Sequence, residues 1–225
     1  PDDPSRWVMD RFVREIDLVR EALNLERLHL FGSSWGGFLA IEYLLGRSEG
    51  VVSAVLASTT ASTLQFEESV TSRVRDMPNE VRRTLEAEEP PTDSSYEEAV
   101  MAFYLRHLCR MDPWPAEMQR AGASIFGPGR QTYETMWGPN ETRVTGNLRA
   151  WDRSQQLGEI DVPVLVTYGR YDEITPKFAN FLQAGIPDAA IEVFEESSHT
   201  AHFEERARYM QVVGDFLRDA ESQEH

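Results

Sequence analysis

The sequence predicts an α/β fold in which a mostly parallel sheet is flanked by helices and interrupted by an inserted helical cap. Three observations predict it. Helical and strand-like segments alternate over residues 1–57, residues 58–157 carry helical patterns broken by prolines and glycines, and apolar strands return within residues 158–225. Because strands that alternate with helices pair in parallel, we expect one sheet domain that carries an insertion.

The first part of the core, residues 1–57, alternates helix and strand. Residues 10–23 carry apolar side chains at helical spacing, and residues 27–31 are a short, mostly apolar strand. Helical patterning resumes at residues 38–45, and residues 51–57 are a second apolar strand. This order of elements predicts two neighbouring parallel strands joined by a helix.

The cap and the second part of the core follow. Residues 58–157 contain amphipathic stretches without strand character, so we assign them to a helical cap. Strand character returns at residues 162–169 and 190–194, and a closing helix is expected over residues 204–217. We therefore assign residues 158–225 to the second part of the core.

Charge and cysteine content exclude several partners. The chain has 38 acidic and 22 basic residues, a formal net charge of −16, which repels phosphate backbones and anionic lipids. We therefore expect neither nucleic acid nor membrane as a partner. Cys109 is the single cysteine, which excludes an internal disulfide and favours a reducing compartment. The expectation is a cytoplasmic protein in which Cys109 is a buried structural thiol.

The most informative motif is Gly-Ser-Ser-Trp-Gly-Gly at residues 32–37, a Gly-x-Ser-x-Gly between a predicted strand and a predicted helix. The turn in such a motif is so tight that the positions two before and two after the serine carry almost no side chain, a demand that Gly32 and Gly36 meet. The motif predicts Ser34 as a nucleophile, and the amide of Trp35 as an oxyanion donor at the helix N-terminus. A plain glycine-rich turn is the alternative.

A serine nucleophile needs an adjacent base, and that base needs an acid that fixes its tautomer. In a parallel sheet both belong at the carboxyl ends of later strands. Asp172 follows the predicted strand 162–169, and His199 follows the predicted strand 190–194. We therefore predict a catalytic triad of Ser34, Asp172 and His199.

His202 is the rival candidate for the base. It lies closer to the closing helix than to the loop after the last strand, so we favour His199. The cluster of His199, His202 and Glu204 raises the question of a metal site, but its spacing differs from the His-Glu-x-x-His of metalloproteases. We expect neither a metal nor a cofactor.

With these residues in place, the chain resembles the proline iminopeptidases of the α/β-hydrolase fold, including the tricorn-interacting aminopeptidase, and the related amino-acid amidases. The resemblance spans nearly the whole chain. Besides the serine motif, it rests on Gly-Pro-Asn-Glu at residues 138–141, on the stretch 146–152, and on Gly-Arg-Tyr-Asp-Glu-Ile-Thr-Pro at residues 169–176. The serine motif is shared by many hydrolases, whereas the pieces at 138–141 and 169–176 are much narrower.

The resemblance implies a serine aminopeptidase that releases an N-terminal residue, with proline favoured, through an acyl-enzyme on Ser34. It also implies that Glu141 and Glu173 hold the free α-amino group of a peptide or amino-acid amide. Two charge-assisted hydrogen bonds to a protonated amine would fix the register of such a substrate. Ordinary surface carboxylates are the alternative for both residues.

The chain departs from the family upstream of the serine motif. The family has a His-Gly-Gly-Pro-Gly type loop and several strands there, which this sequence does not show. We therefore expect a missing N-terminal segment that supplies the second oxyanion donor and covers the apolar edge of the first strand. An amino-acid amidase, a carboxylesterase and a non-catalytic ligand-binding protein stay open as functions. An epoxide hydrolase is disfavoured, because that branch usually has aspartate at the position of Ser34.

Overall fold

The computed structural model describes residues 3–89 and 91–223. Within them the strands form one parallel sheet in chain order, and the strands are β1 (Leu28–Ser33), β2 (Val51–Ala57), β3 (Val164–Gly169) and β4 (Ala189–Phe194). The inner strands β2 and β3 are buried along their whole length, which explains why their sequences are almost continuously apolar. The predicted parallel sheet is confirmed.

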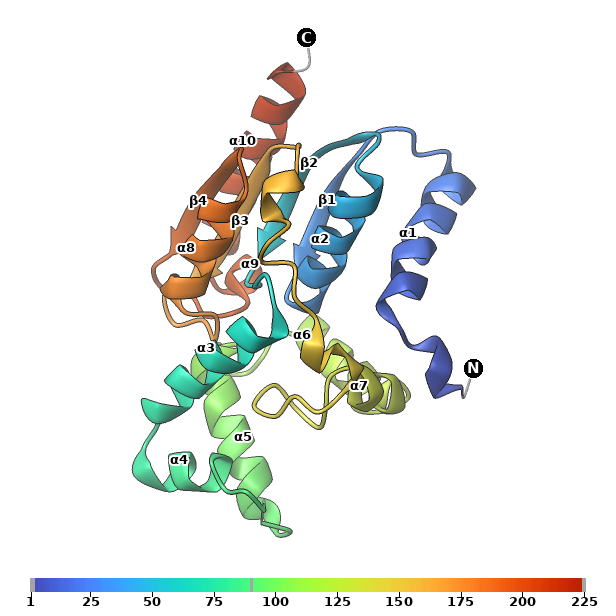
Figure 1. Cartoon of the computed structure of the whole chain (residues 1–225). Helices are drawn as coiled ribbons and strands as arrows, with labels where there is room; N and C mark the ends of the chain where they lie inside the picture. Colours follow the sequence, from blue (N-terminus) through green and yellow to red (C-terminus); the bar gives the residue numbers. More distant parts are fainter. Residues whose placement is uncertain (1–2, 90, 224–225) are drawn as a thin grey trace.

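Helices cover the sheet (Figure 1). In chain order, α1 packs on α2, α2 packs on β1 and β2, α8 packs on β3 and β4, and α10 packs on β2. Their bounds are α1 (Met9–Leu23), α2 (Trp35–Arg47), α8 (Pro176–Gly185) and α10 (Arg206–Gln223). The helix predicted over residues 10–23 ends as expected, because Asn24 adopts the left-handed conformation with φ 53°.

Alternate side chains of β2 show which helix lies on which face. Ala54 and Leu56 belong to the large core cluster that contains the buried side of α2. The hydroxyl of Ser53, which points to the other face, lies 2.7 Å from Nδ1 of His29. Nε2 of that ring lies 3.1 Å from a carboxylate oxygen of Glu221 on α10. The helices α2 and α10 therefore sandwich the sheet between them.

The middle of the chain forms a helical layer at the carboxyl edge of the sheet (Figure 1). Its helices are α3 (Thr63–Arg75), α4 (Asn79–Leu85), α5 (Ser94–His107), α6 (Ala116–Ile125) and α7 (Arg130–Met136). Two side chains of α3 join this layer to the loop after β3, since Ser69 and Arg73 donate hydrogen bonds to the carbonyls of Glu173 and Asp172. The layer thus lies over the loops that follow the strands. The division of the chain into residues 1–57, 58–157 and 158–225 stays a prediction.

The predicted elements differ from the structure mainly at their ends. α2 begins at Trp35, earlier than the predicted residue 38, because the turn at Ser34 leads directly into the helix. The closing helix predicted over residues 204–217 is divided into α9 (Ala201–Glu204) and α10. The break lies at Glu205, whose backbone leaves helical geometry while its carboxylate accepts hydrogen bonds from Glu196 N and Ser197 Oγ.

Cys109 follows α5 and is fully buried with a free thiol, as predicted. Its carbonyl accepts a hydrogen bond from the indole of Trp114. No helix among the described residues is both long enough and apolar enough to cross a membrane.

Candidate active site

Ser34 lies on the turn between β1 and α2, with φ 56° and ψ −123°. Such angles are strained for any residue with a side chain, so the surrounding structure must hold the turn. Gly32 permits it, because a Cβ there would lie 2.3 Å from the carbonyl oxygen of Gly36. The steric demand predicted at Gly36 is wrong, since a Cβ there meets nothing within 4 Å. Gly37 meets that demand instead, because its Cβ would lie 2.5 Å from the side chain of Thr59.

Trp35 is the first residue of α2. Its N–H is one of the donors that an α-helix leaves without an intrahelical acceptor, and the helix dipole favours negative charge at this end. The indole ring packs edge-on against Phe12, with 5.0 Å between ring centroids. The backbone of Trp35 is thereby fixed next to Ser34, while its role as oxyanion donor stays a prediction.

Asp172 and His199 meet at the carboxyl edge of the sheet. Asp172 follows β3 and His199 follows the neighbouring strand β4. Nδ1 of His199 lies 2.8 Å from Oδ1 of Asp172, and both side chains are buried. Since a carboxylate only accepts, Nδ1 carries the proton and Nε2 is the nitrogen left to act as a base. The rival candidate His202 lies on α9, with its ring 5.9 Å from that of Tyr209.

The two residues that follow β2 tie the loops of Ser34 and His199 together. Ser58 Oγ donates to the carbonyl of His199 at 3.0 Å, and Thr59 Oγ1 donates to the carbonyl of Ser34 at 2.9 Å. In the part of the chain that the structure describes, no hydrogen bond joins Ser34 Oγ to His199. Such contacts are often long in unliganded sites and tighten when substrate binds.

Glu173 lies beside this pair rather than at the surface. Its side chain is fully buried, and Oε1 lies 3.4 Å from Nδ1 of His199. Neither carboxylate oxygen has a hydrogen-bond partner among the described groups. Burial raises the pKa of Glu173 well above its ordinary value, and the charged form of His199 opposes that rise. The alternative of an ordinary surface carboxylate is therefore wrong for this residue.

Glu141 follows α7 and reaches the same region from the helical layer. Its Oε1 accepts a hydrogen bond from the hydroxyl of Tyr133 at 2.7 Å, and its backbone N–H donates to the hydroxyl of Tyr104 at 3.3 Å. Burial raises the pKa of Glu141, while the hydrogen bond from Tyr133 and the nearby His199 lower it. The two predicted glutamates thus approach His199 from different elements.

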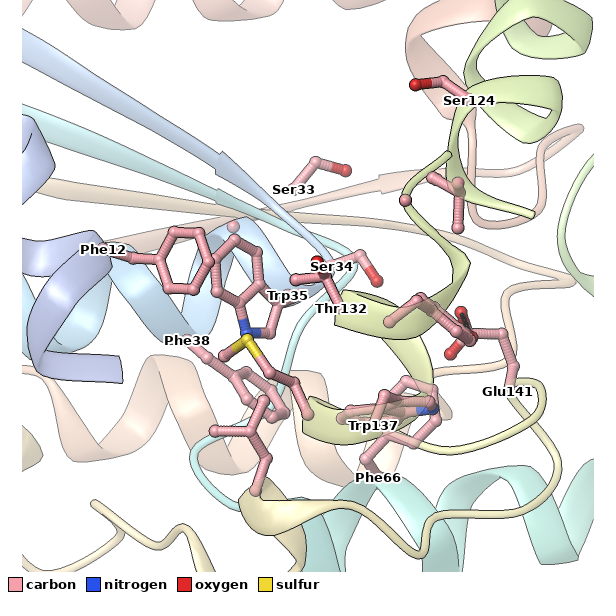
Figure 2. A pocket seen from close by; sticks show the side chains of 16 residues that line it. Phe12, Ser33, Ser34, Trp35, Phe38, Phe66, Ser124, Thr132, Trp137 and Glu141 are labelled. Carbon is pink, nitrogen blue, oxygen red and sulfur yellow. Dashed lines mark hydrogen bonds between the residues drawn. The ribbon is translucent and has the colours of Figure 1, made fainter. Parts of the chain in front are cut away.

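A cavity of about 520 Å³ opens beside Ser34 (Figure 2). Glu141 lies on one side of it, and Phe12, Trp35 and Phe38 lie on the other. Glu141 is the one charged side chain among the described residues that line the cavity, and Glu173 is not part of the lining. The floor and walls are otherwise mostly apolar and aromatic, with Phe66, Met136, Trp137 and Leu148. This lining fits a ligand that places a small apolar group against the aromatic walls and a cationic group beside Glu141.

The charges around His199 favour its protonated form. Burial alone lowers the pKa of this imidazole, but the carboxylates of Asp172, Glu173 and Glu141 together raise it to about 9. An imidazole in that state cannot accept a proton at Nε2. Protonation at Nε2 therefore competes with the action of this imidazole as a base.

His107, at the end of α5, is a functional candidate that the sequence did not reveal. Its carbonyl accepts the backbone N–H groups of both Glu173 and His199, each at 3.2 Å. Its ring Nδ1 donates to the carbonyl of Tyr171 at 2.7 Å. Burial lowers the pKa of His107 to about 4, so the ring is neutral and its tautomer is fixed by that hydrogen bond. A histidine inside a predicted cap helix gives no sequence signal for this role.

His107→Leu is expected to destabilise the protein by about 1–3 kcal/mol and to lower kcat, because it removes the donor to the carbonyl of Tyr171. His107→Asn is the matched control, since its amide can donate from a similar position. Chemical denaturation and steady-state kinetics of both variants check this. Equal effects of the two substitutions would show that the ring only fills space.

Comparisons with known proteins agree with this geometry. A family model described as alpha/beta hydrolase fold matches residues 1–206. The proline iminopeptidase of Heyndrickxia coagulans is 35% identical over 220 residues, which cover 96% of this chain and 76% of that relative.

Solved structures agree as well. The crystal structure of the proline iminopeptidase from Mycobacterium smegmatis matches with a TM-score of 0.92 and 34% identity, over 99% of this chain and 75% of that one. The crystal structure of VinJ matches with a TM-score of 0.91 and 34% identity, over 97% of this chain and 75% of that one. The match thus includes the sheet, the helical layer and the loops that carry the site.

Proposed function

This chain belongs to the proline iminopeptidase family of α/β hydrolases and is a serine hydrolase, and from that premise we propose that it releases N-terminal proline from peptides. One observation carries the proposal. Two carboxylates, Glu141 and Glu173, approach the Asp172–His199 pair, and the oxygens of Glu173 have no hydrogen-bond partner among the described groups. A buried carboxylate without a partner calls for a cation, and the free amine of a peptide supplies one.

In the proposed mechanism, Ser34 Oγ attacks the carbonyl carbon of the first residue while Nε2 of His199 takes the hydroxyl proton. A carbon–oxygen bond forms, and the carbonyl oxygen becomes an oxyanion that faces the N–H of Trp35. When the carbonyl re-forms, the carbon–nitrogen bond breaks and His199 gives its proton to the leaving amine. Water then attacks the ester with the help of the same base, which releases the amino acid and restores Ser34. Asp172 holds the ring of His199 in the required tautomer throughout.

Proline is the favoured first residue because of the walls of the cavity. Phe66, Met136 and Trp137 offer apolar and aromatic contact to a small ring. A charged side chain would find no partner of opposite sign there except at Glu141, which the amine is proposed to occupy. An N-terminal residue with a compact apolar side chain therefore suits the site best.

A free amine is expected to be essential. A prolyl anilide should be hydrolysed about 10²–10⁴-fold more efficiently than its N-acetylated form, since acetylation removes two charge-assisted hydrogen bonds. Comparison of kcat/KM for the two anilides and for a simple acetate ester provides the measurement. Equal rates for the free and acetylated anilides would exclude an aminopeptidase and leave an esterase or a general amidase.

We assign the protein to the cytoplasm in this proposal. Cys109 is the single cysteine of the sequence and its thiol is free, so the chain has no internal disulfide. A chain of this size without a disulfide is typical of a reducing compartment, which supports the assignment. Detection of the tagged protein in cell fractions would test the assignment.

A further inference from the structure

Glu173 is held rigidly by its backbone while its carboxylate is left without donors. Its N–H donates to the carbonyl of His107 at 3.2 Å, and its own carbonyl accepts from Ser69 Oγ at 2.6 Å. The side chain is fully buried, and Oε1 lies 3.4 Å from Nδ1 of His199. That nitrogen is the same one that Asp172 contacts at 2.8 Å. Two carboxylates therefore face one edge of the imidazole.

The surroundings of His199 carry an excess of negative charge. The ionisable groups that face it are Asp172 and Glu173 after β3, Glu141 after α7, and His202 on α9. The other neighbours are neutral at their contact points, since α5 contributes the carbonyl of His107 and β2 leads into the hydroxyl of Ser58. On α3, Arg73 donates to the carbonyl of Asp172. Glu173 does not line the cavity, but it lies close enough to Glu141 for their charges to interact. It can therefore be neutralised by a proton, by an imidazolium, or by a cation that enters the cavity beside Glu141.

We propose that Glu173 is a positioning residue through which the amine of the substrate switches on the base, a role that rests on the proposed function. Because Glu173 is buried without a hydrogen-bond donor, it is charged only when a cation lies beside it, and in the empty site that cation is the imidazolium of His199, which Asp172 also contacts. The Nε2 proton of this imidazolium prevents it from accepting another. A substrate ammonium beside Glu141 gives Glu173 a second cationic partner, so the imidazolium loses part of its stabilisation. His199 then releases its Nε2 proton to solvent and can take the proton of Ser34.

This coupling would discriminate substrates at the chemical step as well as in binding. A peptide whose amine is blocked brings no cation, and it meets His199 in the protonated form that the neighbouring carboxylates favour near pH 7. A peptide with a free amine carries the group that converts the base to its active form. Recognition of the amine by Glu141 alone would affect binding only.

The test uses an amine-free acetate ester, because its hydrolysis does not depend on amine binding. In the wild-type enzyme, kcat/KM for this ester should rise with pH and level off near the pKa of His199, which is about 9. Glu173→Gln should move that midpoint down by about 1–3 pH units, since it removes a negative charge close to the ring. At pH 7 the variant should therefore hydrolyse the ester about 10-fold faster, while it hydrolyses a prolyl anilide more slowly.

Glu141→Gln is the matched control. Its carboxylate lines the cavity and accepts from Tyr133. It is the weakest of the three carboxylates in its effect on His199. The control should also lose activity on the prolyl anilide, but its midpoint for the ester should move by less than that of Glu173→Gln.

A second measurement needs no substitution of Glu173. In Ser34→Ala protein, the imidazole signals of His199 are titrated by NMR with and without L-prolinamide. The ligand should lower the midpoint of His199, and N-acetylprolinamide should leave it unchanged.

The outcomes separate this proposal from the proposed function. An unchanged ester midpoint in Glu173→Gln, or an unchanged His199 titration with prolinamide, would overturn the coupling even if prolyl anilides are hydrolysed. The third outcome is a shifted ester midpoint in Glu173→Gln together with equal hydrolysis of the free and acetylated anilides. It would show that Glu173 acts on the base, but it would overturn both the switch by the amine and the aminopeptidase function.

Discussion

Ser34→Ala is expected to lower kcat/KM for a prolyl anilide by about 10⁵–10⁶-fold, because the acyl-enzyme cannot form without the hydroxyl. Residual hydrolysis would come from the remaining donors and from substrate positioning. The variant should still fold, since alanine keeps the Cβ on the turn after β1. Steady-state kinetics and labelling by a fluorophosphonate check this, and full activity or retained labelling would refute Ser34 as the nucleophile.

Ser34→Gly distinguishes the chemistry of this residue from the strain of its backbone. It removes the same hydroxyl, so it should be as inactive as Ser34→Ala. Glycine reaches φ 56° and ψ −123° without the steric cost that any Cβ carries. The free energy of unfolding of the glycine variant should therefore exceed that of the alanine variant by about 1 kcal/mol. A glycine variant less stable than the alanine variant by about 0.5–1 kcal/mol, the entropic cost of glycine alone, would show that the turn is not strained in solution.

The parts of the fold that the sequence predicts are those with local signals. β2 is an almost continuous apolar run because it is buried on both faces, and the strand-to-helix turn at Ser34 follows from its glycines. The positions of Asp172 and His199 follow from topology, since the loops after parallel strands meet at one edge of the sheet. The meeting of these two side chains at 2.8 Å agrees with that expectation.

The parts that the sequence did not predict depend on packing between distant segments. The close approach of Thr59 to Gly37, which makes Gly37 the constrained position, joins the loop after β2 to the first turn of α2, and these are adjacent only in the fold. The carbonyl of His107 meets Glu173 and His199 because α5 docks on the loops after β3 and β4. Helical periodicity places a residue on a face of its own helix, but it does not specify what the end of that helix will contact.

The two glutamates were predicted in part: the sequence indicated their positions but not their surroundings. Their positions after α7 and β3 were inferred from a resemblance, not from periodicity or spacing. The sequence could not show that Glu173 is buried without a hydrogen-bond donor while Glu141 lines the cavity. That difference arises from the depth of each side chain, which only the packing of the helical layer determines. The distinct tasks proposed for the two residues rest on this difference.

Asp172→Asn is expected to lower kcat/KM by about 10²–10⁴-fold, both for the prolyl anilide and for an acetate ester. The asparagine oxygen can keep the positions of the hydrogen bonds to His199 Nδ1 and to the N–H of Ile174, which Oδ1 accepts at 2.8 and 2.9 Å. The geometry is therefore retained, and the loss reflects the missing negative charge that stabilises the imidazolium during acyl transfer. Kinetics with both substrates, together with the free energy of unfolding, provide the measurement.

Glu173 should determine how much activity remains in that variant, because its carboxylate is then the one still in contact with Nδ1 of His199. In the wild type, Glu173→Gln is expected to speed ester hydrolysis at pH 7, since it releases the base from its protonated form. In the Asp172→Asn background the same substitution should slow the ester reaction, since it removes the remaining charge in contact with Nδ1 and leaves only the weaker effect of Glu141 to stabilise the imidazolium. The double-mutant cycle should therefore show a change of sign rather than additivity. If Glu173→Gln had the same effect in both backgrounds, the two carboxylates would act independently, and only Asp172 would serve the base.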